Sequence, residues 1–184
     1  MTSIRRFFAA AGVTGLVVTG AALVPTPAAG APACPTGWGS QPKVSDTDTS
    51  ATLTGIRAGQ ARCHDRVVID LEGAPDGYDV RYVDGFNTEG EGRDVLARGG
   101  AKLQVIVRSP AHDDDGRATY TPADDTELVD TRGARTLRQG VWLGSFEGQT
   151  SIGLGVRARL PYRVHVEDGP GPTSRVIVDI AHTW

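Results

Sequence analysis

The sequence contains few of the side chains from which catalytic sites are built. Among 184 residues there are two cysteines and four histidines, and aromatic residues make up 6% of the chain. The histidines, at 64, 112, 165 and 182, form neither an H-E-x-x-H motif nor an i,i+4 pair, so their spacing does not support a zinc site. No G-x-S-x-G nucleophile elbow occurs, and Gly153-Leu154-Gly155 lacks the third glycine and the helix of a dinucleotide-binding loop. We therefore predict no catalytic residue, no metal site and no cofactor.

Positive charge is also scarce. Lysine occurs only at positions 43 and 102, and the whole chain carries 19 basic against 22 acidic residues. If Arg5 and Arg6 are removed with a leader peptide, 17 basic residues remain and the net charge is about −5. A negative chain is poorly suited to nucleic acid or to an anionic membrane surface, whereas a neutral glycan is not disfavoured. The charge balance predicts no nucleic-acid partner.

Only one long apolar run is present, and it lies at the N-terminus. Two arginines precede the uncharged stretch 7–24, which is followed by two prolines and by small residues up to position 33. This order is typical of a secretory signal peptide, and cleavage after residue 29, 30 or 33 fits it. We assign residues 1–30 to the signal peptide and expect a secreted product, extracellular or attached to the cell wall, that meets the membrane only during export. An uncleaved membrane anchor is the alternative, because the run approaches the roughly 20 residues of a spanning helix.

The two cysteines, Cys34 and Cys63, both follow the predicted signal peptide. An exported chain meets oxidising conditions, and a disulfide between them is therefore the expected state. A reactive thiol would need stabilisation of its thiolate, and only His64 is adjacent in sequence. In the loop-entropy model, a bridge closing about thirty residues contributes roughly 3–4 kcal/mol to stability.

The rest of the chain predicts short strands. Apolar and polar residues alternate, or β-branched residues cluster, in segments separated by Gly, Pro and Asp, at residues 52–58, 65–71, 78–84, 102–108, 141–146, 150–156, 162–167 and 174–182. This pattern indicates an all-β sandwich or barrel over residues 52–184, preceded by a flexible N-terminal segment at 31–51. The polar stretches 86–101 and 109–126 are predicted to be exposed loops. In the second of these, Asp113-Asp114-Asp115-Gly116 does not have the ligand spacing of an EF-hand, and a solvated acidic loop is the simpler interpretation.

Nearly the same six residues occur twice, as RVVIDL at 66–71 and RVIVDI at 175–180. In a strand, Arg66 and Asp70 lie on the same face about 13 Å apart, which is too far for an ion pair within the strand. We interpret the two copies as similar strands in two packed sheets. In each strand the charged residues cap the strand end or pair with a neighbouring strand.

The order of several motifs resembles that of a known family. The strings DRVVIDLEG, GYDVRYVD, FEGQTSIGLG, LPYRVHV and RVIVDIAH, found in this order between residues 52 and 184, resemble the AMIN-like domain of secreted actinobacterial proteins, which is related to the AMIN module of cell-wall amidases. The resemblance implies a β-sandwich that binds peptidoglycan or an envelope protein and is not an enzyme. It supplies no catalytic residue, and its paired-cysteine pattern fits Cys63 with Cys34 as the partner.

Candidate binding residues are exposed rings and arginines. Trp38 and Tyr120 are predicted to present rings to a glycan, with Trp184 as a further exposed ring, whereas Trp142 and Phe146 lie in predicted strands and are expected in the core. Trp38 has an alternative role, which is to pack beside the disulfide. Wall carboxylates could be contacted by a basic strip formed by Arg81, Arg157, Arg159 and Arg163. The alternative for these arginines is a solvated sheet face balanced by nearby acids.

Two alternative functions remain at this stage. The first is a small secreted hydrolase of wall polymers that uses paired carboxylates such as Glu72 and Asp76, or Glu147 and Asp179. The second is a protein-interaction module that recruits an envelope enzyme through a sheet edge.

Overall fold

The computed structural model describes residues 34, 37–47, 50–74 and 77–184, and the predicted signal peptide lies outside this part of the chain. All regular elements of the described residues are strands. In chain order they are β1 (Lys43–Ser45), β2 (Thr52–Gln60), β3 (His64–Glu72), β4 (Tyr78–Val83), β5 (Phe86–Asn87), β6 (Asp94–Val95), β7 (Ala101–Val107), β8 (Leu137–Phe146), β9 (Gln149–Val156), β10 (Tyr162–Asp168) and β11 (Thr173–Ala181). In the same described part, no helix has the length and apolar character needed to cross a membrane.

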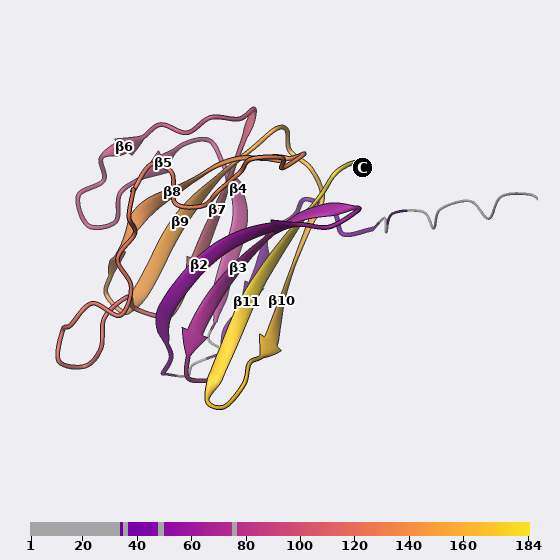
Figure 1. The fold of residues 1–184 in the computed structure, drawn as a ribbon. Coiled ribbons are helices and arrows are strands. Elements are labelled where there is room, and N and C mark those ends of the chain that lie inside the picture. Colours follow the sequence, from indigo (N-terminus) through magenta and orange to yellow (C-terminus); the bar gives the residue numbers. More distant parts are fainter. Residues whose placement is uncertain (1–33, 35–36, 48–49, 75–76) are drawn as a thin grey trace, which may run out of the picture. The chain divides into compact units, whose positions relative to one another are not determined.

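Nine of these strands form two antiparallel sheets that pack face to face (Figure 1). The five-stranded sheet has the order β1-β4-β7-β9-β8, and the four-stranded sheet has the order β10-β11-β3-β2. Strands β5 and β6 make a separate short pair. The structure thus confirms the predicted all-β sandwich.

Alternating side chains build the core between the two sheets. In β3, Val67, Ile69 and Leu71 are at most 1% exposed, and they belong to one hydrophobic cluster with the inward residues of β7, β9 and β11. Because successive side chains of a strand point to opposite faces, each strand supplies the core with every second residue. Each fully buried aliphatic side chain contributes roughly 1.5–3 kcal/mol, so this cluster is the main source of stability.

The two similar hexapeptides are neighbours in one sheet, and the expectation that they lie in two different sheets was wrong. Strands β3 and β11 pair antiparallel, with Arg66 opposite Asp179 and Asp70 opposite Arg175. Antiparallel pairing of two Arg-to-Asp segments places each arginine beside the aspartate of the other strand. Ion pairs form at both ends, with nitrogen–oxygen distances of 2.6 Å for Arg66–Asp179 and 3.2 Å for Arg175–Asp70. Pairing with a neighbouring strand, one of the two roles expected for these charges, is therefore confirmed.

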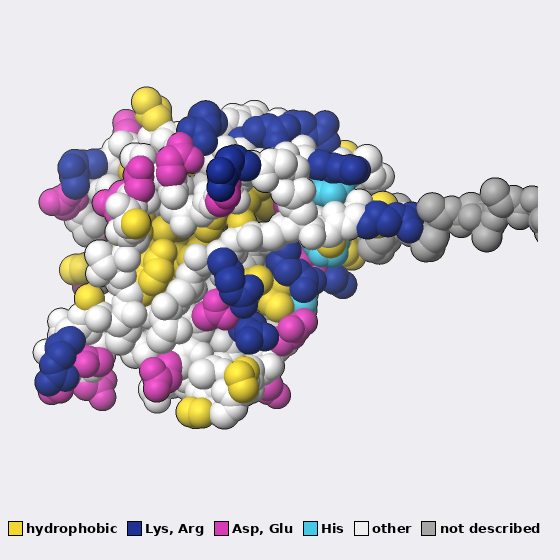
Figure 2. Space-filling model, in the orientation of Figure 1, with side chains coloured by type: hydrophobic (Ala, Val, Ile, Leu, Met, Phe, Trp, Pro, Cys, Tyr) yellow, Lys and Arg dark blue, Asp and Glu magenta, His cyan; other side chains and the backbone are white. Residues whose placement is uncertain are grey.

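The outer face of the four-stranded sheet carries these charges around an apolar centre. Val68 and Ile177 lie opposite each other on this face and are only 5% and 2% exposed. Figure 2 shows arginine and acidic side chains gathered around hydrophobic ones over β2, β3 and β11. The aliphatic stems of arginine side chains can cover apolar surface while their guanidinium groups stay in water. The second face of β3 is thus partly covered without a further layer of backbone.

The outer face of the five-stranded sheet is covered by residues of the segment that carries β5 and β6. The ring of Phe86 is 2% exposed and lies so close to Gly153 that a Cβ there would be 2.7 Å from the ring. At Gly155 a Cβ would overlap the carbonyl oxygen of Arg98. Stretch 86–101 was predicted to be an exposed loop, and that prediction was wrong for Phe86, because glycines in β9 let the segment approach the sheet.

Part of the N-terminal segment that we expected to be flexible, 31–51, takes part in the fold. Strand β1 pairs with β4, and the backbone N–H of Tyr162 donates to the carbonyl of Gly39 at 2.9 Å. The phenol of Tyr162 is also within hydrogen-bond distance of the carbonyl of Gln41, at 2.8 Å. The β1–β4 pairing adds an edge strand to the five-stranded sheet, and the Tyr162 contacts join the segment to β10 of the other sheet.

Candidate functional site

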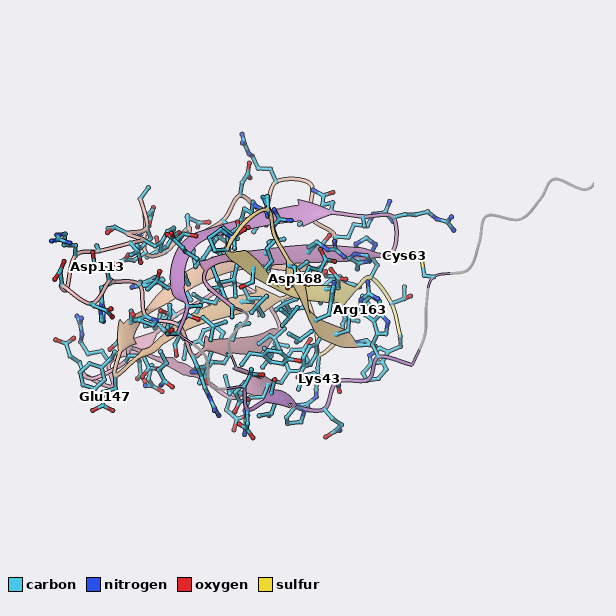
Figure 3. All side chains as sticks on the ribbon, turned by 90° about the horizontal axis from the view of Figure 1, so that it is seen from below. Lys43, Cys63, Asp113, Glu147, Arg163 and Asp168 are labelled. Atoms are coloured by element: carbon cyan, nitrogen blue, oxygen red, sulfur yellow. A yellow bond between two sulfur atoms is a disulfide. The ribbon has the colours of Figure 1, made fainter. Side chains whose placement is uncertain are left out.

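The predicted binding residues lie in two separate places. The first place is the end of the domain where the disulfide lies. Contacts made directly or through one neighbouring residue join four predicted residues to this end, namely Trp38, Arg157, Arg159 and Arg163. Tyr120 lies in the 109–126 loop, which also contains Asp113. Figure 3 shows Cys63 and Arg163 at one end and Asp113 and Glu147 at the other. The five residues therefore do not form one binding surface.

The predicted disulfide is present and ties the N-terminal segment to the start of β3. Cys34 and Cys63 are bonded, with their Cα atoms 5.3 Å apart. Close by, the ring of Trp38 meets the ring of His64 at a centroid distance of 5.6 Å, and the guanidinium carbon of Arg163 lies 4.6 Å from the Trp38 centroid. Trp38 is half-buried by these contacts. It packs in the region of the disulfide, which is the alternative role considered for this residue.

Asp179 is the centre of a buried ionic cluster at this end. Its side chain is 0% exposed, and Arg66 donates to it from Nε at 2.6 Å and from Nη2 at 2.9 Å. Arg163 donates from Nε at 2.9 Å, and His64 Nε2 lies 3.3 Å from Oδ1 without the alignment of a hydrogen bond. Burial raises the pKa of Asp179 and is the largest single influence on it, but the hydrogen bonds from Arg66 and Arg163, together with the charges nearby, lower the net pKa. Burial also lowers the pKa of His64.

Asp65 forms a second buried carboxylate site beside the first. It receives hydrogen bonds from the backbone N–H and hydroxyl of Thr136 at 2.6 and 2.7 Å and from the N–H of Leu137 at 2.9 Å, while His182 Nε2 lies 3.1 Å away. Burial opposes ionisation most strongly, yet these hydrogen bonds together lower the pKa of Asp65 to about 2. In the sequence, an aspartate next to a β-branched run that is expected to be buried indicates that its carboxylate has a hydrogen-bonding or ionic partner. The identity of that partner depends on the tertiary structure.

The remaining arginines of the predicted strip are also engaged within the chain. Arg157 donates from Nη2 to the carbonyl of His182 at 2.8 Å. Arg159 donates to the carbonyl of Ser40 at 3.1 Å, and its guanidinium carbon lies 5.0 Å from the ring centroid of Tyr82. Together with Arg163 on Asp179, these contacts connect the N-terminal segment, the C-terminal end and the two sheets.

Tyr120 lines an open groove of about 400 Å³ on the other side of the domain. Its ring and that of Trp142 have a centroid distance of 5.7 Å and are tilted by 50°. Both rings are half-buried and pack on the core from the groove side. The groove is lined by Ala111, His112, Gly116, Ala118, Tyr120, Thr121, Pro122, Asp125, Trp142 and Ser145.

Hydrogen bonds to backbone carbonyls hold the groove in place. The N–H of Trp142 donates to the carbonyl of Asp125 at 2.7 Å, and the N–H of Leu128 donates to the carbonyl of Gly140 at 2.8 Å, so the loop follows the edge of β8. On the other side, the hydroxyl of Thr119 donates to the carbonyl of Leu53 in β2 at 2.7 Å. A groove anchored to both sheets needs little ordering when a ligand binds, and preorganisation of this kind favours affinity.

Both groove rings keep a polar group available to a ligand. Within the described part of the chain, neither the phenol oxygen of Tyr120 nor the indole nitrogen of Trp142 has a hydrogen-bond partner, and neither atom is fully buried. Partial burial raises the pKa of Tyr120, so its phenol is protonated and can donate. Trp142 was expected in the core. It packs against the main core and also lines the groove, whereas Val141 and Leu143 face the other way, into the smaller cluster around Phe86.

The exposures of two other aromatic residues test the sequence predictions directly. Phe146 is 48% exposed, so the prediction that it lies in the core was wrong, and the reason is its position at the last residue of β8 beside a turn. Trp184 is 68% exposed, which confirms the prediction of an exposed ring.

Of the carboxylate pairs proposed for hydrolysis, Glu147 and Asp179 lie far apart. Asp179 pairs with Arg66 near the start of β3, whereas Glu147 lines a cleft of about 500 Å³ together with Glu72 at the end of β3. Arg66 and Glu72 are six residue steps apart along β3, which corresponds to roughly 20 Å. Asp76 lies outside the described residues. In the described ranges, no group of three or more His, Cys, Asp or Glu side chains is arranged to hold a metal ion.

Comparison with known proteins identifies one family. A family model described as the AMIN-like domain matches residues 51–182. The match begins after β1, so Cys34, Trp38 and β1 precede the matched region. Comparisons with curated proteins and with solved structures produced no match.

Proposed function

The chain belongs to the AMIN-like domain family, and on this premise we propose that it is an exported, non-catalytic module of the cell envelope that binds peptidoglycan. The ligand is proposed to bind in the groove between Tyr120 and Trp142. The predicted signal peptide and the Cys34–Cys63 disulfide support a location outside the cytoplasm, because disulfides persist in oxidising compartments.

The observation that carries this proposal is the pair of half-buried rings with unpaired polar groups beside an open groove. The apolar face of a sugar ring packs against aromatic faces, and its hydroxyls can pair with the Tyr120 phenol, the Trp142 indole and the Asp125 carboxylate. Ligand sites commonly combine apolar and aromatic lining with a few polar groups that set orientation.

We propose a different role for Trp38, Arg157, Arg159 and Arg163. Each makes a contact within the chain that ties it to the disulfide end of the domain. In our proposal these residues stabilise the disulfide end of the domain, and the ligand contact of the predicted set is Tyr120.

Retention of the purified, oxidised protein on insoluble peptidoglycan tests the proposal. We expect Tyr120→Ala to reduce the affinity about fivefold, since aromatic contacts contribute about 0.5–1.5 kcal/mol. Trp184→Ala is a matched control that removes an exposed ring elsewhere, and Arg163→Ala should lower the unfolding temperature while leaving retention unchanged.

Equal retention of wild-type protein and Tyr120→Ala would remove the groove from the proposal, and no retention of wild-type protein would remove wall binding altogether. The soluble fraction of the same experiment addresses catalysis. If reducing ends or soluble fragments accumulate with time, the protein is a hydrolase and the non-catalytic assignment fails.

A further inference from the structure

We propose that the Tyr120–Trp142 groove selects an amino sugar that carries a free ammonium group over its N-acetylated form. This inference rests on the proposed function, because it specifies the ligand of the same groove. The juxtaposition that carries it is a groove lined by two tilted aromatic rings and by Asp125, whose carboxylate is unpaired within the described residues, in a loop with excess negative charge.

The loop that forms the groove carries an excess of negative charge. Residues 109–126 contain five aspartates, at 113, 114, 115, 124 and 125, against one arginine, Arg117, and one histidine, His112, which lines the groove. Arg117 is already paired with Asp113 at 3.2 Å and with Asp115 at 2.6 Å. The groove thus lies in a negative local field, which attracts a cation and disfavours an anionic ligand.

The carboxylate of Asp125 is available to a ligand. Asp125 lines the groove, and its backbone carbonyl is fixed by the N–H of Trp142, but within the described residues its carboxylate has no hydrogen bond or ion pair. Asp124 differs, because its carboxylate accepts hydrogen bonds from the N–H and hydroxyl of Thr126. Of these two neighbouring acids, only Asp125 is both in the groove and available to a ligand.

The two aromatic rings of the groove also favour a cationic ligand. An ammonium group within about 6 Å of an aromatic face is attracted by the electrons of the ring, most strongly by Trp and Tyr. Two rings tilted by 50° with centroids 5.7 Å apart line one groove, and Asp125 lines the same groove. An acetamide at the same position is neutral and gains neither the ring attraction nor the ion pair.

The groove favours a sugar over an isolated amine because its lining is mixed. Ala118 and Pro122 offer apolar surface to ring carbons, and Thr121 has a hydroxyl without a partner in the described part of the chain. An alkylammonium side chain would use the charge but few of these polar groups. A pyranose with an ammonium substituent can use the rings, the carboxylate and the hydroxyl together.

Calorimetric titration with two soluble probes tests the inference. The probes are the β-1,4-linked tetramer of glucosamine and the same tetramer fully N-acetylated, at mildly acidic pH where the free amines are protonated. We expect the charged tetramer to bind roughly tenfold more tightly, and the difference to shrink with added salt. Asp125→Asn should weaken the charged tetramer roughly fivefold and leave the acetylated tetramer unchanged.

Asp168→Asn is the matched control, because Asp168 is an exposed aspartate on β10 in the other sheet and its replacement removes the same charge. Equal binding of the two tetramers would overturn this inference and leave the proposed function standing. Binding of neither tetramer by a protein that is retained on peptidoglycan would also overturn it. If butylammonium binds as tightly as the charged tetramer, the groove does not select a sugar and this inference is overturned. If the protein neither binds a tetramer nor is retained on peptidoglycan, the proposed function fails as well.

Discussion

Asp65 combines complete burial with an ionised side chain, and this combination has a measurable consequence. Removal of a carboxylate from water favours its neutral form, but three hydrogen bonds from Thr136 and Leu137 stabilise the anion. The net pKa is about 2, below the ordinary value of 3.8. A carboxyl group with a lowered pKa in the folded state stabilises the fold above its ordinary pKa, and this contribution is lost as the pH falls through the folded-state pKa.

We therefore predict that the free energy of unfolding decreases as the pH falls from about 5 to about 2, with Asp65 contributing about 2 kcal/mol of the decrease. Urea unfolding at a series of pH values measures it. Asp65→Asn should be less stable at neutral pH and should show a shallower pH dependence. Some dependence will remain in that variant, since the pKa of Asp179 is lowered as well. An unchanged slope in Asp65→Asn would contradict the assignment.

At the level of elements, the pairing of β3 with β11 explains why one short motif occurs twice. In an antiparallel pair, a segment that begins with Arg and has Asp four residues later matches a second copy of itself end to end. The arrangement satisfies all four charges across the strands. The same register places Val67 opposite Val178 and Ile69 opposite Val176 on the core side. Function is not needed to explain the repeat.

Strand β9 depends on glycine for a different reason. At Gly155 the backbone carbonyl of Arg98 occupies the space that a Cβ would need, and a backbone atom cannot rotate away as a side chain can. We predict that Gly155→Ala lowers the free energy of unfolding by about 2 kcal/mol or more, because either the sheet or the covering segment must shift.

Chemical denaturation of Gly155→Ala alongside Gly59→Ala measures this effect. Gly59 lies in β2 and has no positive φ, and a Cβ added to it would meet no atom within 4 Å, so its replacement should be neutral or slightly stabilising. If the two variants are equally stable, the close approach at Gly155 does not constrain the fold.

For the whole domain, the N-terminal segment closes one end of the sandwich. The disulfide fixes Cys34 to the start of β3, Trp38 covers His64 and Arg163, and β1 extends the five-stranded sheet. The family match begins only at residue 51, so these contacts are added to the matched domain. A segment with few core residues of its own gains its order from such tethers.

We predict that replacing both cysteines by serine lowers the free energy of unfolding by roughly 3–4 kcal/mol, because a bridge with a sequence separation of 29 restricts the unfolded chain. Denaturant unfolding of the double variant and of the oxidised protein measures the difference. A reductant should destabilise the wild-type protein to a similar extent and leave the double variant unchanged. Equal stability of the oxidised protein and the double variant would show that the bridge is not a stabilising element.

The strands, the all-β class and the disulfide could be predicted from the sequence because they depend on local pattern and on the compartment. Alternation with period two follows from strand geometry wherever one face is buried, and two cysteines in an oxidising environment have one partner each. The position of Tyr120 in a polar loop was also readable, but the packing of its half-buried ring on the core was not.

The tertiary structure decided which distant residues meet. It placed the two hexapeptides side by side, put Phe86 onto Gly153, and turned Trp142 toward the groove while its neighbours in β8 face the opposite side. It also assigned Arg157, Arg159 and Arg163 to contacts within the chain. The sequence pattern indicates which side chains share a face of a strand. Which surface covers that face depends on how the sheets and loops pack, and that is determined by the summed contacts of the whole domain.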